Sequence, residues 1–244
     1  MSLLEKILKA CQDGRKQIAV LIDPDKTEDP GLDRLVGLAA EAGVGFFFVG
    51  GSLLVKDRLE ACLKRIKAHS NIPAILFPGS PMQISPLADG ILFLSLISGR
   101  NPELLIGQHV IAAPYLRQTD LEVLPTGYML VDGGRPTTVS YMSQTAPIPA
   151  DKDDIAATTA LAGELLGLKL MYLDAGSGAL NPVRPSMIRA VRETVHAPLI
   201  VGGGIRTPGQ AAAAVAAGAD LVVVGNVLEK EPGVLGELTR AIKG

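Results

Sequence analysis

The sequence has no tryptophan, few aromatic residues of any kind and only two cysteines. Aromatic residues make up 4% of the chain while hydrophobic residues make up 48%, so we expect a core built from aliphatic side chains. Cys11 and Cys62 both fall within amphipathic, helix-like segments. This arrangement excludes a disulfide scaffold and is typical of a reduced compartment. We therefore expect a cytoplasmic protein.

A strong charge of either sign is also missing. The chain carries 23 Lys and Arg against 25 Asp and Glu, which gives a formal net charge of −2. That balance argues against a nucleic-acid partner or a membrane surface held mainly by charge. Because only 20% of the residues are charged, long disordered stretches are not expected either.

No uncharged apolar run reaches the ~18 to 20 residues that a membrane-spanning helix needs. Asp89, Arg100, Lys169 and Asp220 interrupt the most hydrophobic regions, and the first residues lack a signal-peptide pattern. No linker rich in serine and glycine and no block of charge divides the chain. We therefore expect one globular domain over residues 1–244, without a transmembrane segment.

Glycine (27 residues) and proline (17 residues) are abundant, and they end a series of short apolar runs. Such runs are typical of strands buried on both faces of a parallel sheet. The runs span residues 17–24, 45–51, 73–79, 90–96, 127–132, 169–176, 197–204 and 220–226. We predict a strand at each.

Helical patterns separate most of these strands, at residues 32–42, 53–70, 102–109, 153–166, 185–195, 208–217 and 232–242. A further helix is predicted over residues 3–9, before the first strand. Eight strands alternating with helices favour an α/β fold of the closed (β/α)8 type, a TIM barrel, over an open doubly wound sheet.

Two places break the repeat. The connection over residues 80–86 is too short and too rich in proline for a full helix, and residues 110–126 read as a long insert before the fifth strand. We therefore expect a modified barrel in which one outer helix, after strand three, is lost or replaced.

Glycine-rich ends of strands seven and eight indicate a phosphate site. In such barrels the chemistry lies at the carboxyl ends of the strands, and phosphate commonly binds after strands seven and eight. Gly203 and Gly204 follow strand seven, and Gly225 with Asn226 ends strand eight. Glycine lets backbone N–H groups at a helix start approach phosphate oxygens closely. The alternative is that these glycines only form tight turns.

Strand six ends in an acid followed by small residues. Asp174 lies on the strand itself, and Gly176, Ser177 and Gly178 follow it. Asp174 is therefore expected beside a bound phosphorylated molecule, where it can act as a general base on a substrate hydroxyl. The alternative is an aspartate that caps its turn or pairs with Arg184.

Asp23 at the end of strand one and Ser52 after strand two form a candidate Mg²⁺ site. A carboxylate and a hydroxyl on neighbouring strand ends suit a hard ion that keeps several waters and binds substrate phosphate. On its own, the sequence around Asp23 is also an ordinary turn. The histidines are scattered along the chain, which argues against zinc.

Two further segments have no single interpretation. Residues 132–135, Asp-Gly-Gly-Arg, suit a turn with a solvated arginine as well as a site. Residues 75–81 and 91–101 are apolar even beyond their strand ends. If the missing helix leaves a groove there, a long hydrocarbon can lie in it, but plain barrel packing explains the pattern equally well.

In combination, these motifs resemble a known family, the geranylgeranylglyceryl phosphate synthases and the related heptaprenylglyceryl phosphate synthases. The matching segments run in order over nearly the whole chain: residues 21–26, 49–52, 77–80, 172–178, 201–206 and 224–226. Single segments such as the triple glycine are weak signals, whereas the ordered set is specific.

The resemblance implies a Mg²⁺-dependent prenyltransferase that joins a polyprenyl diphosphate to the 3-hydroxyl of sn-glycerol 1-phosphate and releases diphosphate. It implies that Asp23 and Ser52 bind Mg²⁺ and that Asp174 is the catalytic base. The residues implied to bind glycerol 1-phosphate are Tyr172, Leu173, Asp174, Ala175, Gly176, Ser177, Gly178, Gly203, Gly204, Gly225 and Asn226.

Two positions depart from the pattern of that family. The acid of strand six is more commonly Glu, so Asp174 needs its substrate about one methylene closer. The heptaprenyl branch typically has Lys two residues before the strand-one aspartate, where this chain has Leu21. We therefore expect a C20 geranylgeranyl donor. Phe46, Phe47, Phe48, Phe77, Phe93 and Leu96 are candidates for the side chain that closes the prenyl groove.

Association and two other functions are also considered. The resemblance implies at least a dimer. The Ala-rich segment 211–217 and the apolar residues at 141–142, which are expected in a loop, support this indirectly.

A lipid product allows transient contact with a membrane. The alternatives are a phosphate-binding isomerase or lyase acting on a sugar or indole-glycerol phosphate, and a non-catalytic binder of a phosphorylated metabolite.

Overall fold

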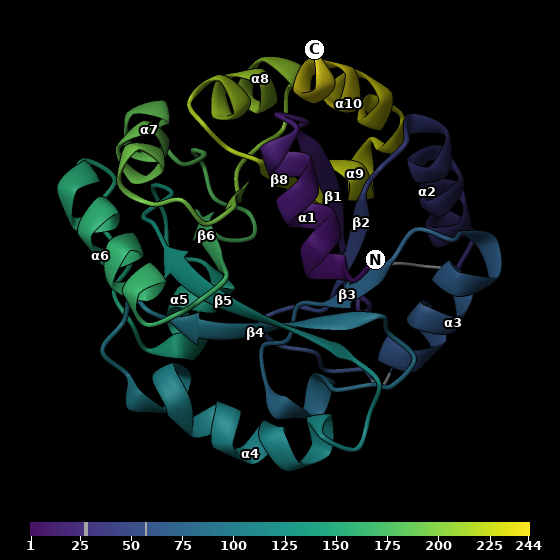
Figure 1. Cartoon of the computed structure of the whole chain (residues 1–244). Helices are drawn as coiled ribbons and strands as arrows, with labels where there is room; N and C mark the ends of the chain where they lie inside the picture. Colours follow the sequence, from purple (N-terminus) through teal and green to yellow (C-terminus); the bar gives the residue numbers. More distant parts are fainter. Residues whose placement is uncertain (27–28, 57) are drawn as a thin grey trace.

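Eight parallel strands close into a barrel in their order along the chain, as the computed structural model shows (Figure 1). The structure describes residues 1–26, 29–56 and 58–244. The strands are β1 (Gln17–Ile22), β2 (Phe46–Val49), β3 (Ala74–Leu76), β4 (Gly90–Leu96), β5 (Glu122–Leu130), β6 (Leu170–Asp174), β7 (Leu199–Gly202) and β8 (Leu221–Val224). The predicted TIM-barrel class is confirmed.

A ring of helices surrounds the strands (Figure 1). The α-helices are α1 (Leu3–Gln12), α2 (Asp29–Ala42), α3 (Leu59–His69), α4 (Gln108–Leu116), α5 (Thr138–Ser143), α6 (Asp153–Leu165), α7 (Pro185–Thr194), α8 (Pro208–Ala216), α9 (Asn226–Lys230) and α10 (Leu235–Lys243). Shorter turns are η1 (Pro81–Gln83), η2 (Glu103–Gly107) and η3 (Pro232–Val234). No helix among the described residues has the length and apolarity needed to span a bilayer.

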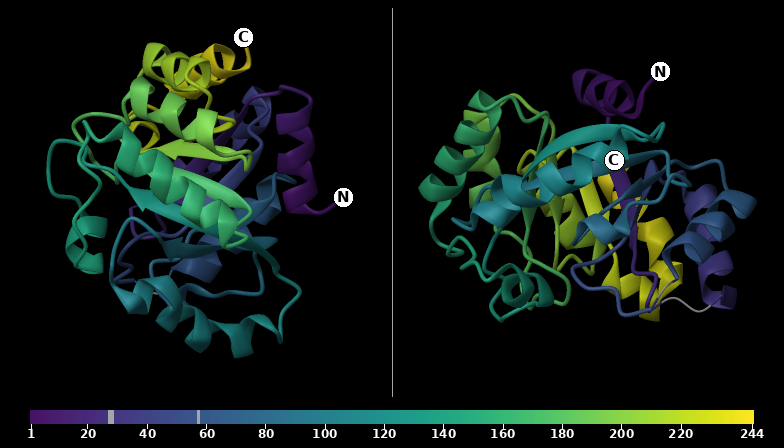
Figure 2. Two further views of the ribbon diagram at one scale, coloured as in Figure 1. Left: turned by 60° about the vertical axis from the view of Figure 1, so that its left-hand side comes forward. Right: turned by 90° about the horizontal axis from the view of Figure 1, so that it is seen from below.

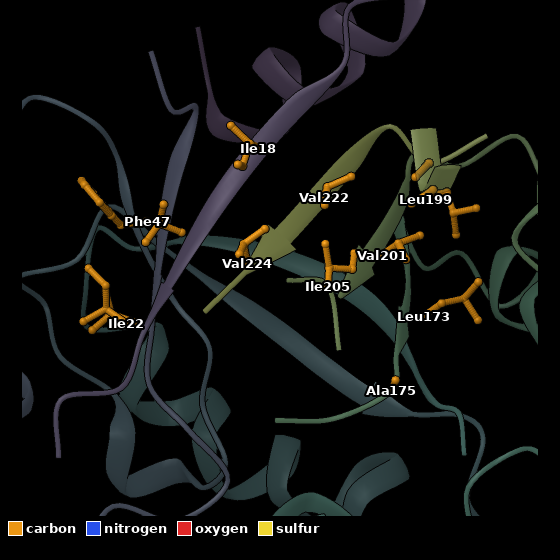
Figure 3. Packing of buried hydrophobic residues seen from close by; sticks show 14 of the residues in the cluster. Ile18, Ile22, Phe47, Leu173, Ala175, Leu199, Val201, Ile205, Val222 and Val224 are labelled. Atoms are coloured by element: carbon orange, nitrogen blue, oxygen red, sulfur yellow. The ribbon is translucent and has the colours of Figure 1, made fainter. Parts of the chain in front are cut away.

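Alternation along the strands produces two buried layers, because successive side chains of a strand point to opposite faces. One layer fills the barrel and includes Phe46, Phe48 and Tyr172. The other lies between the strands and the helices, where Figure 3 shows Leu173 and Val201. Both faces of the sheet are therefore buried, which explains why the strands are continuous apolar runs in the sequence.

Helix α1 covers the amino-terminal end of the barrel, at the opposite end from α5 (Figure 2, right). Its side chains Leu3 and Ile7 join the interior layer. The carboxylate of Glu122 accepts hydrogen bonds from the backbone N–H groups of Leu3 and Leu4 at 2.5 and 2.8 Å, where the first turn of a helix has free donors. The carboxyl ends of the strands are thereby left as the open rim.

The expected loss of an outer helix after strand three is confirmed, because only the 3₁₀ turn η1 lies between β3 and β4. This short turn still has a positioning role. The side-chain amide of Gln83, which is buried, donates to the carbonyl of Gly51 at 2.9 Å and accepts from the N–H of Gly79 at 3.2 Å. The turn therefore holds the loop that carries Ser52.

The predicted insert over residues 110–126 is wrong. Helix α4 continues to Leu116 despite Pro114 inside it, and β5 begins at Glu122 rather than at residue 127. All seven residues of β4 pair with β5, from Gly90 with Glu122 to Leu96 with Tyr128. The short polar turn between α4 and β5 is therefore an ordinary connection.

Two smaller expectations also change. The helix predicted over residues 53–70 begins at Leu59, and residue 57 lies outside the described residues. Tyr141 and Met142 lie in helix α5 rather than in a loop, although both are exposed. Segment 211–217 lacks a polar stripe partly because Ala211, Ala214 and Ala217 are buried within this chain. Their burial explains part of the apolar pattern without a second subunit.

Candidate active site

A cavity lies at the carboxyl ends of the strands, with about 1130 Å³ of open space. Its lining includes most of the residues expected in the site: Asp23, Ser52, Tyr172, Asp174, Ser177, Gly178, Gly203, Gly204, Gly225 and Asn226. Strands one, two, six, seven and eight therefore contribute to one site, although their residues are far apart in the sequence.

Three of the expected residues lie away from this cavity. The side chains of Leu173 and Ala175 pack in the layer between strands and helices, as the alternation on β6 requires (Figure 3). Gly176 is buried, and its N–H donates to the Oδ1 atom of Asp174 at 2.7 Å. These residues shape the loop, whereas Tyr172 and Asp174 face the cavity.

Asp174 is a buried carboxylate held by two donors. Its side chain is 6% exposed, and the hydroxyl of Tyr128 donates to Oδ2 at 2.6 Å. Burial raises the pKa of Asp174, while the hydrogen bonds from Tyr128 and Gly176 oppose that shift. Of the two alternatives to a catalytic role, the turn cap is present, since Gly176 donates to Asp174, whereas the guanidinium of Arg184 donates to the carbonyl of Ala150.

Aromatic rings form the floor beneath Asp174. The rings of Phe77 and Tyr172 stack with centroids 5.6 Å apart, and Tyr128 meets Tyr172 edge-on at 5.3 Å. Burial first, and then the nearby Asp174 charge, raise the pKa of both tyrosines well above the usual value. Both hydroxyls therefore remain protonated, and that of Tyr128 stays a donor toward the carboxylate.

The loops after β6 and β7 meet closely enough that Gly203 leaves no room for a side chain. Gly203 has φ +78°, and a Cβ there would lie 2.6 Å from the Asp174 carboxylate and 2.7 Å from the N atom of Ala175. The hydroxyl of Ser177 donates to the side-chain oxygen of Asn226 at 2.9 Å, which joins the β6 loop to the start of α9. Backbone amides therefore border the cavity where a phosphate can bind.

Asp23 lies at the end of β1, between the β8 loop on one side and the β2 loop on the other. Its Oδ2 atom lies 2.8 Å from the ammonium of Lys26, and a Cβ on Gly51 would be 3.8 Å from its carboxylate. The carboxylate of Asp25 accepts hydrogen bonds from the backbone of Val55 and Lys56, which fixes the β1 loop against the β2 loop. The two strand ends that carry Asp23 and Ser52 are thus held together.

The donor set at this place suits a hard divalent cation. Asp23 supplies a carboxylate and Ser52 a hydroxyl, and both line the same cavity. Because the protein supplies few oxygen ligands, water and substrate phosphate can occupy the remaining coordination positions. Mg²⁺ is usually bound in this way. Within the residues that the structure describes, no group of three or more His, Cys, Asp or Glu side chains forms a denser metal site.

A second, apolar cavity opens beside the first and encloses about 1000 Å³ of open space. The two share Gly51, Ser52, Phe77, Tyr128 and Val139 in their linings. The groove runs over β3 and β4 beneath the place where the outer helix is replaced, with Phe93, Leu96 and Leu104 on its walls. The expected groove is therefore present.

Three of the six expected groove-closing side chains reach this groove, namely Phe77, Phe93 and Leu96. Phe46 and Phe48 instead fill the barrel. Phe47 packs in the outer layer (Figure 3). His109, expected at a helix end, is buried in the groove, and its ring meets Phe93 edge-on at 4.4 Å. Burial lowers the pKa of His109, so this wall carries a neutral imidazole.

Comparison with known proteins agrees with this geometry. Residues 12–243 match the PcrB family. The chain belongs to the PcrB family. Two relatives, the geranylgeranylglyceryl phosphate synthases of Spirosoma linguale and Chitinophaga pinensis, are 55% identical over 230 residues and 53% identical over 229. Each alignment covers 94% of this chain, with 92% and 91% of the relative.

Solved structures of other proteins also resemble this PcrB family member. The (S)-3-O-geranylgeranylglyceryl phosphate synthase of Thermoplasma acidophilum, crystallised with sn-glycerol 1-phosphate, superposes with a TM-score of 0.94 at 36% identity. The match covers 100% of this chain and 99% of that one. Tryptophan synthase of Mycobacterium tuberculosis reaches a TM-score of 0.62 at 17% identity, which is a likeness of fold alone.

Sequence reasoning missed three residues of the site: Tyr128, Lys26 and Glu229. Tyr128 is an inward position of β5 level with Tyr172 on β6, so its place follows once the strand boundaries are known. Lys26 lines the cavity from the loop that follows β1, and Glu229 lines it from helix α9 after β8. Partial burial raises the pKa of Glu229, which the nearby Lys26 opposes. The sequence around Glu229, in helix α9, contains no motif that indicates a site.

Proposed function

We propose that this protein transfers a geranylgeranyl group from its diphosphate to the 3-hydroxyl of sn-glycerol 1-phosphate and releases diphosphate. The observation that carries the proposal is the union of an amide-bordered cavity with an apolar groove, sharing Ser52, Phe77 and Tyr128. A sugar-phosphate isomerase has no use for the groove. The names of the relatives and the glycerol 1-phosphate bound to the Thermoplasma acidophilum protein support the same reaction.

The phosphate of glycerol 1-phosphate lies, on this proposal, against the loops that follow β6, β7 and β8. Gly178, Gly204 and Gly225 line the cavity, and α9 begins there at Asn226. Backbone N–H groups can donate to three phosphate oxygens without a side chain between them. Phosphate held in this way leaves the glycerol carbons directed toward the barrel axis and Asp174.

The prenyl chain occupies the apolar groove over β3 and β4. Its wall is built from aliphatic and aromatic side chains such as Ile91, Phe93 and Leu104. Burial of hydrocarbon there contributes about 25 cal/mol for each Å² of apolar surface removed from water. The donor is held by its chain on one side and by its diphosphate near Asp23 on the other, which places the allylic carbon between the two cavities.

Asp23 and Ser52 would hold Mg²⁺, whose chemistry is to stabilise negative charge that grows on the leaving diphosphate oxygens. The bond between the allylic carbon and oxygen breaks, and its electron pair stays on diphosphate. The glycerol oxygen forms the new ether bond and gives its proton to Asp174. Burial of Asp174 raises its pKa and so makes it a stronger base than an exposed aspartate.

We further propose a cytoplasmic enzyme that assembles as a dimer or larger and meets a membrane only briefly to deliver its lipid product. Exposed apolar side chains support an association surface, with Tyr115 62% and Tyr141 82% exposed. Light scattering that gave a mass near 25.5 kDa at micromolar concentration would contradict the assembly.

The function is tested by incubating the protein with radiolabelled sn-glycerol 1-phosphate, Mg²⁺ and geranylgeranyl diphosphate, and following the label into butanol. We expect label in butanol only when all three are present. Replacing Mg²⁺ by a chelator should stop the transfer. Label that stays in water, together with turnover of a sugar phosphate, would favour the isomerase or lyase instead.

A further inference from the structure

The positive charge available to the substrates is scarce in this cavity. Among the described residues that line it, Lys26 and Arg206 are the cationic ones, against Asp23, Asp174 and Glu229. A phosphate ester and a diphosphate ester each bring more than one negative charge. The cavity therefore needs a mobile cation as well as backbone amides to hold both substrates together.

Arg206 is already committed to the protein backbone. Its guanidinium donates to the carbonyl of Leu180 at 3.0 Å and to the carbonyl of Ala179. Those bonds tie the β7 loop to the β6 loop and leave Arg206 a structural part of the phosphate cradle. The ammonium of Lys26, in contrast, forms an ion pair with Asp23, and its side chain is 46% exposed.

Resting on the proposed function, we propose that Lys26 binds the diphosphate of the prenyl donor, and that in the substrate-free enzyme the same ammonium neutralises Asp23. Lys26 lies three residues after Asp23 and 2.8 Å from its carboxylate, so it borders the place assigned to the leaving group. A lysine side chain is long and rotatable, and its three N–H donors suit diphosphate oxygens.

Asp23 and Lys26 would exchange partners when the substrates bind. The carboxylate of Asp23 would hold the divalent cation, and the ammonium of Lys26 would bind the diphosphate. Glu229 stands near enough to Lys26 and Asp23 for its charge to act on both. The number of opposite-charge contacts is therefore kept through the exchange.

Calorimetric titration of inorganic diphosphate in the presence of Mg²⁺ tests this role without any transfer reaction. We expect Lys26→Gln to weaken diphosphate binding at least tenfold and Lys26→Arg to stay within about threefold of the wild type. Lys230→Gln removes an exposed lysine of α9 and is the matched control, with no more than a twofold change expected. Thermal unfolding establishes that each variant is folded.

A second titration, with Mg²⁺ alone, separates this role from a structural one. Removing the ammonium takes away a cation that competes with the metal for the Asp23 carboxylate, so Lys26→Gln should bind Mg²⁺ as tightly as the wild type or more tightly. Weaker Mg²⁺ binding, a diphosphate change below threefold, or an equal loss in the Lys230→Gln control would overturn the proposal. If prenyl transfer stands while any of these is seen, the proposed function survives and the role of Lys26 does not.

Discussion

The hydroxyl of Tyr128 should control the pH at which Asp174 accepts a proton. It donates to Oδ2 of Asp174 at 2.6 Å in a buried setting and so stabilises the ionised carboxylate. A hydrogen bond to a charged group contributes about 1.5 to 3 kcal/mol. At about 1.36 kcal/mol for each pKa unit, Tyr128→Phe should raise the pKa of Asp174 by about one to two units.

The measurement is the pH profile of kcat/KM for prenyl transfer. Activity requires Asp174 ionised, so its acid limb should move to higher pH by about one to two units in Tyr128→Phe. The ring contacts with Phe77 and Tyr172, at 5.9 and 5.3 Å, persist in a phenylalanine, so the effect belongs to the hydroxyl. Tyr115→Phe, which changes an exposed tyrosine, is the control. An acid limb that stays in place would refute the assignment of Asp174 as the base.

Three further variants separate the parts of the site. Asp23→Asn should reduce Mg²⁺-dependent transfer by more than tenfold, about 1.4 kcal/mol, while the affinity for glycerol 1-phosphate, from calorimetry, changes less than twofold. Gly225→Val should raise KM for glycerol 1-phosphate by more than any loss of Tm explains, because the new side chain enters the lining of the cavity; φ is −133°, which any residue can adopt, and the added Cβ would lie 3.2 Å from the Cβ of Leu21. An unchanged KM contradicts the phosphate site. Asp220 pairs with both Lys16 and Arg192 at the end of the barrel opposite the site. Asp220→Asn should therefore lower the free energy of unfolding, measured by urea titration, by about 3 kcal/mol and leave KM unchanged.

The strand-ending glycines and acids predicted most of the site because barrel topology brings all carboxyl ends to one rim. Given that rule, Asp23 and Asp174 had to lie in one cavity although some 150 residues separate them in the chain. The apolar excess beyond strands three and four allowed either a groove or plain barrel packing, and the groove is seen only in the structure.

The remainder depended on side-chain direction and on boundaries that no local pattern fixes. Glu122 and Thr126 are polar, so the start of β5 resembled a loop, and the inward position of Tyr128 could not be assigned. Leu173 and Ala175 share the motif of Asp174 but point outward by alternation along the strand. Lys26 lies in a turn of charged residues, where only the folded cavity distinguishes a site from a solvated surface.

On the proposed function, the protein holds glycerol 1-phosphate and a C20 chain in two joined cavities. The most direct test offers the protein sn-glycerol 1-phosphate, Mg²⁺ and equal amounts of C15, C20 and C35 prenyl diphosphates, and measures the products by mass spectrometry. The account predicts one dominant ether that carries the C20 chain. A dominant C35 ether, or no ether with any donor, would contradict it.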